Sequence, residues 1–189
     1  MMGEAIKAVS RAAGGNDDHE DLRGVAIYGG EGPQHLLSEL TFAATNRYLV
    51  AAYGPNLRVA DGITVQGELL AVVPVASLKA FLEAVPKYEP GVLTVDKEAQ
   101  TLTINGSEPI AISTKIKYPP VFRLFPNEPT HKDATLTDIA IRGKVIKALA
   151  SIVTAQKGAE LNLRAIKRTI PTMAGTIGDV QILVSVGSA

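Results

Sequence analysis

The sequence predicts an α+β fold in which helices pack on antiparallel sheets, and two observations support this class. The stretch Gly67–Pro126 contains a short apolar run, an amphipathic helix and then three strand-like runs separated by turn-forming residues. The part of the chain after Pro126 repeats this plan of strand, helix and three strands, although the residues themselves do not match. Because a helix beside an antiparallel meander is an α+β building block, the repeat predicts a repeated α+β architecture.

The elements of the stretch Gly67–Pro126 follow from local signals. Its first apolar run stops at Pro74, and apolar residues then recur over Ser77–Val85 at the spacing of one helix face. Pro86 ends this helix, because proline cannot continue the backbone hydrogen bonding. Three runs of β-branched or alternating apolar residues follow as expected strands: Val92–Val95, Leu102–Ile104 and Ile110–Ile116.

The same reasoning predicts a helix over Glu4–Ala13, ended by Gly14, and another helix over Lys144–Thr154. The glycine-rich segment Gly29–Pro33 lacks the Lys-Ser/Thr pair and the following helix of a phosphate loop, so we predict a hairpin connection. The remaining expected strands are Gly24–Tyr28, Leu36–Thr45, Tyr48–Tyr53, Leu57–Val65, Leu136–Ile141, Leu161–Ile166, Thr169–Met173 and Val180–Val186. The first part of one of them, Leu36–Leu40, could by itself also be helical.

Composition bounds the class of protein. The 189 residues suffice for one large domain or two small ones, and 46% hydrophobic residues suffice for a packed core. Nineteen basic and nineteen acidic residues give no net charge, which argues against a uniformly basic nucleic-acid binder but not against a segregated basic face. The absence of cysteine, of a membrane-length apolar run and of a signal-peptide pattern leads us to expect a cytoplasmic protein.

The polar, proline-containing segment 127–134 is the expected linker. It divides the chain into a larger domain over residues 1–126 and a shorter domain over residues 135–189.

Four segments, taken in order along the chain, carry a resemblance to a known family. They are Glu4–Ala12 (EAIKAVSRA), Leu40–Leu49 (LTFAATNRYL), Val73–Lys79 (VPVASLK) and Ser113–Phe122 (STKIKYPPVF). These segments resemble the first helix, a strand with its turn, the entry to the second helix and the domain-closing strand of the bacterial DNA polymerase III beta sliding clamps. The resemblance implies a DNA clamp-like fold with about one and a half clamp domains in this shortened chain.

The sequence also departs from the family pattern. Asn46 and Pro120 stand where the family has acidic residues, and the family's first strand has no room before Glu4. Residues 135–189 look like a clamp domain without its middle, and Val184–Ala189 has no counterpart of the family's Met-Pro-rich carboxyl end.

The resemblance implies a processivity factor of DNA replication, which encircles duplex DNA as a homo-oligomeric ring and tethers a DNA polymerase or another clamp-binding enzyme. The alternative is a clamp-fold structural or protein-binding oligomer without a DNA function, which the zero net charge and the shortened second half leave open. A third interpretation is a small-molecule-binding α+β protein, for which the sequence nominates no pocket residues.

We expect no enzyme activity, and no catalytic residue, metal site or cofactor. His19, His35 and His131 are far apart and show no metal-ligand spacing, and the acidic stretch Asp17–Asp21 is typical of a solvated loop. No nucleophile elbow, Walker or Rossmann pattern is present.

Two sets of residues are candidates for binding. Basic residues opposite the apolar helix stripes predict non-sequence-specific contacts to DNA phosphates, although Lys79 could instead pair with Glu83. These DNA-binding candidates are Lys7, Arg11, Arg23, Lys79, Lys144 and Lys147. The resemblance also implies an apolar groove for partner peptides, and its candidates are Thr45, Leu49, Pro126, Val184 and Val186, of which Leu49 and Val184 could equally fill the core.

Overall fold

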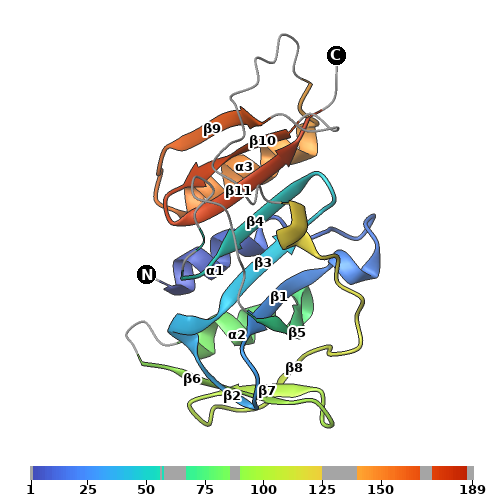
Figure 1. Cartoon of the computed structure of the whole chain (residues 1–189), viewed down its shortest axis with the longest axis vertical. Helices are drawn as coiled ribbons and strands as arrows, with labels where there is room; N and C mark the ends of the chain where they lie inside the picture. Colours follow the sequence, from blue (N-terminus) through green and yellow to red (C-terminus); the bar gives the residue numbers. More distant parts are fainter. Residues whose placement is uncertain are drawn as a thin grey trace.

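The computed structural model describes residues 2–55, 57, 67–85, 90–124, 140–166 and 172–186. Within these residues, strands form a seven-stranded and a four-stranded sheet, and all neighbouring strands are antiparallel (Figure 1). The larger sheet has the order β5 (Glu68–Pro74), β1 (Gly24–Gly29), β3 (Thr41–Thr45), β4 (Leu49–Tyr53), β11 (Val180–Ser185), β10 (Thr172–Ile177) and β9 (Leu161–Ile166). The smaller sheet has the order β2 (Gln34–Leu36), β6 (Val92–Asp96), β7 (Thr101–Ile104) and β8 (Ile110–Ala111).

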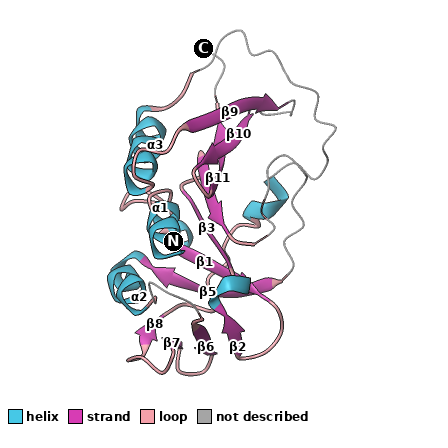
Figure 2. Cartoon of the chain, turned by 90° about the vertical axis from the view of Figure 1, so that its left-hand side faces the viewer, coloured by secondary structure: helices cyan, strands magenta, loops and turns pink. Residues whose placement is uncertain are grey.

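The α-helices of the described residues stand in a column on one side of the larger sheet (Figure 2). They are α1 (Met2–Ser10), α2 (Leu78–Ala84) and α3 (Gly143–Ala155), and α1 contacts both of the others. The column exists because each helix is amphipathic: Ile6 and Val9 of α1 are fully buried, whereas Lys7 between them is exposed. Short 3₁₀ turns are η1 (Glu20–Leu22), η2 (Leu37–Glu39), η3 (Val75–Ser77) and η4 (Val121–Leu124).

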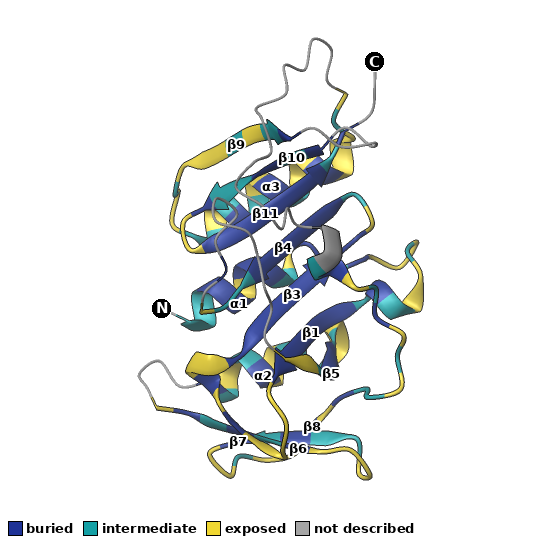
Figure 3. Ribbon diagram, viewed as in Figure 1, coloured by how far each residue is buried: buried dark blue, intermediate teal, exposed yellow. Residues whose placement is uncertain are grey.

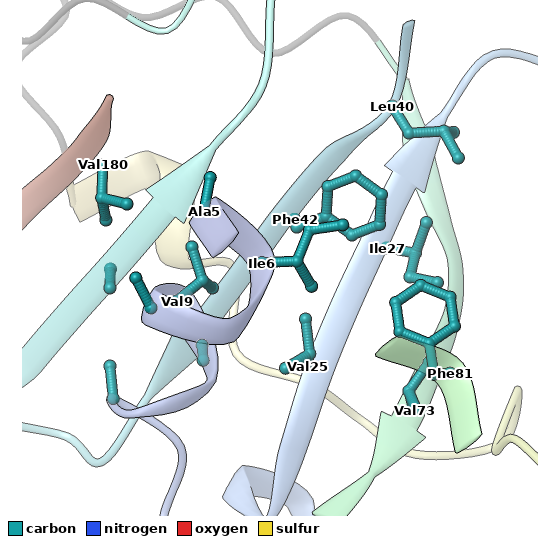
Figure 4. Packing of buried hydrophobic residues seen from close by; sticks show 14 of the residues in the cluster. Ala5, Ile6, Val9, Val25, Ile27, Leu40, Phe42, Val73, Phe81 and Val180 are labelled. Carbon is teal, nitrogen blue, oxygen red and sulfur yellow. The ribbon is translucent and has the colours of Figure 1, made fainter. Parts of the chain in front are cut away.

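The main core lies between the helix column and the larger sheet and extends to buried residues of the smaller sheet. Figure 3 shows the buried parts of the strands in dark blue. Figure 4 shows Ile6 of α1 next to Phe42 of β3, in the same cluster as Val9 of α1, Val25 of β1 and Phe81 of α2. The rings of Phe42 and Phe81 have centroids 6.2 Å apart, and both side chains are fully buried. Full burial of an apolar side chain contributes about 1.5–3 kcal/mol, so this layer holds the helices on the sheet.

The opposite face of the larger sheet carries a second apolar cluster, and the segment before η4 covers it. Small side chains such as Ala26 and Ala43 let this segment approach the strands closely. Tyr118 is buried there, and its hydroxyl donates a hydrogen bond to the carbonyl oxygen of Ala43 at 3.4 Å. Both faces of β1 and β3 are therefore buried, which explains their continuous apolar sequences.

The larger sheet runs without a break through both predicted domains. β4 belongs to residues 1–126 and β11 to residues 135–189, and these strands pair with Leu49 opposite Val184 and Val50 opposite Leu183. The Ser185 amide also donates to the Tyr48 carbonyl oxygen at 2.8 Å. The proposed division into two domains stays a prediction, and the expected linker 127–134 lies outside the described residues.

Most predicted elements appear close to their expected places. The helix expected over Glu4–Ala13 is α1, the one over Lys144–Thr154 is α3, and Ser77–Val85 holds the end of η3 and α2. The helical alternative for Leu36–Leu40 is confirmed in part, because η2 interrupts the strand pattern there. The strands Leu57–Val65, Leu136–Ile141 and Thr169–Met173 lie largely outside the described residues.

Two local predictions are wrong. Gly29–Pro33 is not a hairpin, because β1 and β2 belong to different sheets and the glycines carry the chain from one sheet to the other. The alternation over Ile110–Ile116 gives only the two-residue strand β8. After it the chain turns to β5, where Ser113 and Val72 exchange backbone hydrogen bonds of 2.8 and 2.9 Å.

Candidate partner-binding site and basic helix face

The turn between β3 and β4 presents Arg47 at the surface. Asn46 sets the turn, since its Oδ1 accepts hydrogen bonds from the amides of Tyr48 and Leu49 at 3.2 and 3.0 Å. The Thr45 hydroxyl oxygen accepts a further hydrogen bond from the Arg47 amide at 3.1 Å. These bonds hold Arg47 at a φ of 77°, a left-handed conformation that non-glycine residues rarely adopt.

A loop between α1 and β1 lies beside this turn, and Arg23 holds it closed. The Arg23 guanidinium donates two hydrogen bonds to the Asp18 carbonyl oxygen, at 3.0 and 2.8 Å, and another to the carbonyl oxygen of Asn16. The Gly14 amide closes the loop by donating to the Leu22 carbonyl oxygen at 2.8 Å. Arg23 therefore has a structural role, and this loop places His19, Asp21 and Leu22 next to Thr45 and Arg47.

The segment around Tyr118 forms the third side of the site. Burial raises the pKa of the Tyr118 hydroxyl well above its ordinary value, which keeps this side chain neutral and anchored under the sheet. The anchor places Lys117 and Pro119 at the surface and Val121 in the interior.

Together, the turn, the loop and the Tyr118 segment enclose a hollow of about 300 Å³. Its buried lining residues are Leu22, Thr45 and Val121, and Pro119 is half-buried. The rim residues His19, Arg47 and Lys117 are exposed, and Asp21 lies 3.1 Å from the Nδ1 of His19. We define this set of eight lining residues as the partner hollow.

Of the predicted groove residues, the structure places Thr45 in the partner hollow. Leu49 and Val184 are completely buried and lie opposite each other across β4 and β11, so they belong to the core and not to a surface groove. Val186 is also buried, at 3% exposure, and Pro126 lies outside the described residues. The groove assignment is therefore corrected: both strands turn these apolar side chains toward the helix column, where water is excluded.

Sequence reasoning missed the other lining residues of the hollow. Two of the four segments that resemble the clamp family, Leu40–Leu49 and Ser113–Phe122, supply Arg47, Lys117, Pro119 and Val121. The resemblance to the clamp family therefore already marked the segments that carry these four lining residues. What the sequence did not reveal is that the loop carrying His19 would close the site from the other side.

Some of the predicted DNA-binding cations form ion pairs with described carboxylates, and others form none. Lys79 lies 3.8 Å from Glu83 on α2, and Lys144 lies 3.3 Å from Asp18. Lys7, Arg11 and Lys147 are exposed and form no ion pair with any described residue. These three cations, on or next to α1 and α3, form what we call the basic helix face.

The first turn of α3 is tied to the β3–β4 turn by Tyr48. The Arg142 guanidinium carbon lies 4.3 Å from the centroid of the Tyr48 ring, and the Lys144 ammonium nitrogen lies 4.8 Å from it. Partial burial pushes the pKa of Asp18 upward, but the Gly15 amide and the Lys144 ammonium outweigh this and hold the pKa below its ordinary value. Asp18 is therefore ionised at neutral pH and pairs with Lys144.

The described residues bring no three His, Cys, Asp or Glu side chains together in a way that could hold a metal ion. None of the described helices is both long and apolar enough to span a membrane.

No protein-family model matches the sequence, and no curated protein matches it. Solved structures do match. The DNA polymerase III beta subunit from Thermotoga maritima has a TM-score of 0.59 and 12% identity, and the match covers 100% of this chain and 62% of that one. The DNA polymerase sliding clamp from Bacillus subtilis has a TM-score of 0.58 and 10% identity, covering 100% and 63%. The DNA polymerase III beta subunit from Borrelia burgdorferi has a TM-score of 0.61 and 10% identity, covering 100% and 61%.

The fold of this chain is that of the bacterial DNA polymerase III beta sliding clamps. The predicted α+β class, with helices packed on antiparallel sheets in a clamp-like fold, is confirmed. The chain spans about 62% of the length of the solved beta subunit from Thermotoga maritima.

Proposed function

We propose that this protein is a sliding clamp-like processivity factor, which encircles duplex DNA as an oligomeric ring and tethers a polymerase or another DNA enzyme. One observation carries the proposal: the described α-helices stand on one side of a continuous sheet, and the exposed cations of the basic helix face lie on or next to these helices. A surface of helices backed by a sheet can follow a duplex without reading its bases. The solved proteins of this fold are described as sliding clamps and polymerase subunits, so the proposed role is a tether and not a catalyst.

The proposed DNA contacts are electrostatic. Lys7, Arg11 and Lys147 have no competing carboxylate among the described residues, so phosphate oxygens would be their first anionic partners. Contacts of this kind are independent of sequence, and they weaken as salt concentration rises. Lys144, Lys79 and Arg23 contribute less to this proposal, because each already binds a carboxylate or carbonyl oxygens.

The ring is proposed to be a homo-oligomer, and the outer strands of the two sheets support this part of the proposal. The outer strands β9, β8 and β2 each have a described neighbouring strand on one side only. An unpaired strand edge is a template for pairing with another chain, so these edges are the proposed contacts between copies.

The partner hollow is the proposed attachment point for the tethered enzyme. Its apolar floor of Leu22, Pro119 and Val121 suits an apolar side chain of a short peptide. Each fully buried anchor contributes about 1.5–3 kcal/mol, and ordering of the peptide offsets part of this. The balance gives the modest affinity that exchange between partners requires.

A specific observation favours the second candidate, a clamp-fold protein-binding oligomer without a DNA function. Three of the six predicted DNA-binding cations already have partners within the chain, and the net charge of the chain is zero. Such a protein would keep the hollow and the strand edges and make no use of the basic helix face.

The deciding experiment combines imaging with retention on DNA. Electron microscopy should show a ring with a hole wide enough for duplex DNA, and the ring should stay on circular DNA and leave it after linearisation. The variant Lys7→Glu/Lys147→Glu should lose this retention, whereas Lys97→Glu/Lys115→Glu, the same charge change at exposed sites outside the helices, should keep it. Rings that bind no DNA would favour the second candidate, and a strictly monomeric protein would refute the ring.

A further inference from the structure

His35 is the single buried residue of β2, and its imidazole lies in an apolar part of the core. The residue is 8% exposed, and Leu93 stands opposite it on β6. Side-chain atoms of Leu40, Leu70 and His35 converge on the space beside Gly29, where an added β-carbon would stand 3.3 Å from the His35 Nδ1. The Nε2 of the ring is buried and has no hydrogen-bond partner among the described residues. Buried polar atoms without a partner are rare in folded proteins, so this nitrogen calls for an explanation.

The charged residues that the structure describes on the elements around His35 are exposed, and none of them forms an ion pair with it. They are Glu31 in the connection before β2, Glu39 of η2, Glu68 of β5, Asp96 of β6, and Lys79 and Glu83 of α2. The last two lie 3.8 Å apart and pair with each other. A proton taken up by His35 in its buried position would therefore create a cation without a bound carboxylate, which is costly in an apolar environment.

β2 is attached to the rest of the molecule by few interactions. It has three residues, and among the described strands it pairs with β6 alone. At its two ends, the Val95 amide donates to the Pro33 carbonyl oxygen at 2.9 Å and the Leu37 amide donates to the Gly91 carbonyl oxygen at 2.8 Å. Segments with few buried side chains open at a low cost in free energy, so β2 can leave β6 while the larger sheet stays intact.

We propose that β2 is released from β6 when His35 takes up a proton. An imidazole in water becomes charged at about pH 6.5, and both of its nitrogens are then hydrogen-bond donors. The charged ring is disfavoured in the core, whereas outside the core water accepts both hydrogen bonds. The neutral ring is thus the form that the closed strand favours, and the β2–β6 pairing weakens as pH falls below about 6.5.

Release of β2 changes the outer edge of the smaller sheet. β6 (Val92–Asp96) then replaces β2 as the outer strand, and its unpaired backbone groups are a template for pairing with another chain. Acid therefore exchanges a three-residue edge for a five-residue one. This change does not depend on DNA binding or on the assembly of copies.

The test measures amide hydrogen exchange of the full chain at pH 7.5 and pH 5.5, with correction for the intrinsic exchange rates. The reporters are the amides of Leu37 and Val95, whose hydrogen bonds break when β2 leaves, and the Ser185 amide in the larger sheet is the reference. Because opening takes up one proton, the protection of both reporters should fall by about tenfold between the two pH values. The protection of Ser185 should stay the same.

Variants of the three histidines assign the effect. His35→Leu removes the titrating ring, so the protection of the reporters should be equal at the two pH values. Its urea midpoint at pH 7.5 should match or exceed that of the wild type, because a buried nitrogen without a partner is lost. His35→Gln is polar and uncharged at both pH values, and it should give the same result if leucine disturbs the packing. His19→Gln/His131→Gln replaces the other two histidines of the chain and should keep the pH dependence.

Three results would overturn the proposal. The first is equal protection of Leu37 and Val95 at the two pH values in the wild type. The second is a pH dependence that persists in both His35 variants, since another group would then be responsible. The third is a loss of protection at Ser185 as large as that at the reporters, which would indicate acid unfolding of the whole chain and not release of β2.

Discussion

The guanidinium of Arg142 stacks on the ring of Tyr48, with 4.3 Å between the guanidinium carbon and the ring centroid. Lys144 lies 4.8 Å from the same centroid, so one aromatic ring receives two cations from the start of α3. Tyr48 follows Arg47 of the partner hollow directly in sequence. This contact therefore connects the helix column to the turn that forms one side of the hollow.

We predict that Tyr48→Leu lowers the free energy of unfolding by about 1–2 kcal/mol, because two partly exposed cation–π contacts are lost while an apolar side chain remains. Tyr48→Phe keeps the aromatic ring and should be nearly neutral. Urea denaturation of both variants measures the difference. Equal destabilisation by Phe and Leu would assign the effect to the hydroxyl group and not to the stacked cations.

The Asp18–Lys144 contact should make stability depend on pH. The pKa of Asp18 is below its ordinary value of 3.8 in the folded chain, so its ionised form is favoured by folding. Its contribution is complete above the unfolded pKa and disappears as pH falls through the folded pKa. Asp18→Asn should therefore lower stability by roughly 1 kcal/mol at pH 7 and have less effect at pH 3.

The control for this pH dependence is Asp17→Asn, which changes an exposed neighbouring carboxylate. Urea midpoints measured from pH 3 to pH 7 should diverge from the wild type for Asp18→Asn and run parallel to it for Asp17→Asn. A loss that is the same at every pH would mean that charge at Asp18 does not contribute.

Gly175 of β10 should tolerate no side chain. A β-carbon at this position would stand 1.6 Å from the carbonyl oxygen of Asn162 on β9, and this oxygen cannot move away without disturbing the pairing of the two strands. We expect Gly175→Ala to cost about 1–3 kcal/mol or more, as overpacking does elsewhere. Gly30→Ala is the matched control, because nothing lies within 4 Å of its added β-carbon, and thermal unfolding of both variants tests the prediction.

The sequence predicts the helices and most strands because their signals are local. Ile6 and Val9 recur at helical spacing, Pro74 ends an apolar run and Pro86 ends a helix. These signals do not depend on contacts with distant parts of the chain. The pairing of β4 with β11 is a long-range relation that no local pattern specifies, so Leu49 and Val184 could be assigned to a groove although they are fully buried opposite each other. The hollow escaped prediction for the same reason, since its loop, turn and Tyr118 segment meet only in the folded chain.

The outer edge of β9, which has no further neighbour among the described strands, yields the last prediction. β9 is an outer strand of the larger sheet, and Leu161 at its start is 40% exposed. If copies associate through this edge, as proposed, light scattering at micromolar concentration should give a mass above that of one chain, and Leu161→Glu should lower it by placing a charge in the contact. Val75→Glu introduces the same charge at another exposed apolar residue, 51% exposed in η3, and should leave the mass unchanged. A monomeric wild type would refute association altogether, whereas an oligomer that Leu161→Glu does not weaken would place the contact at a different edge, with β8 the next strand to test.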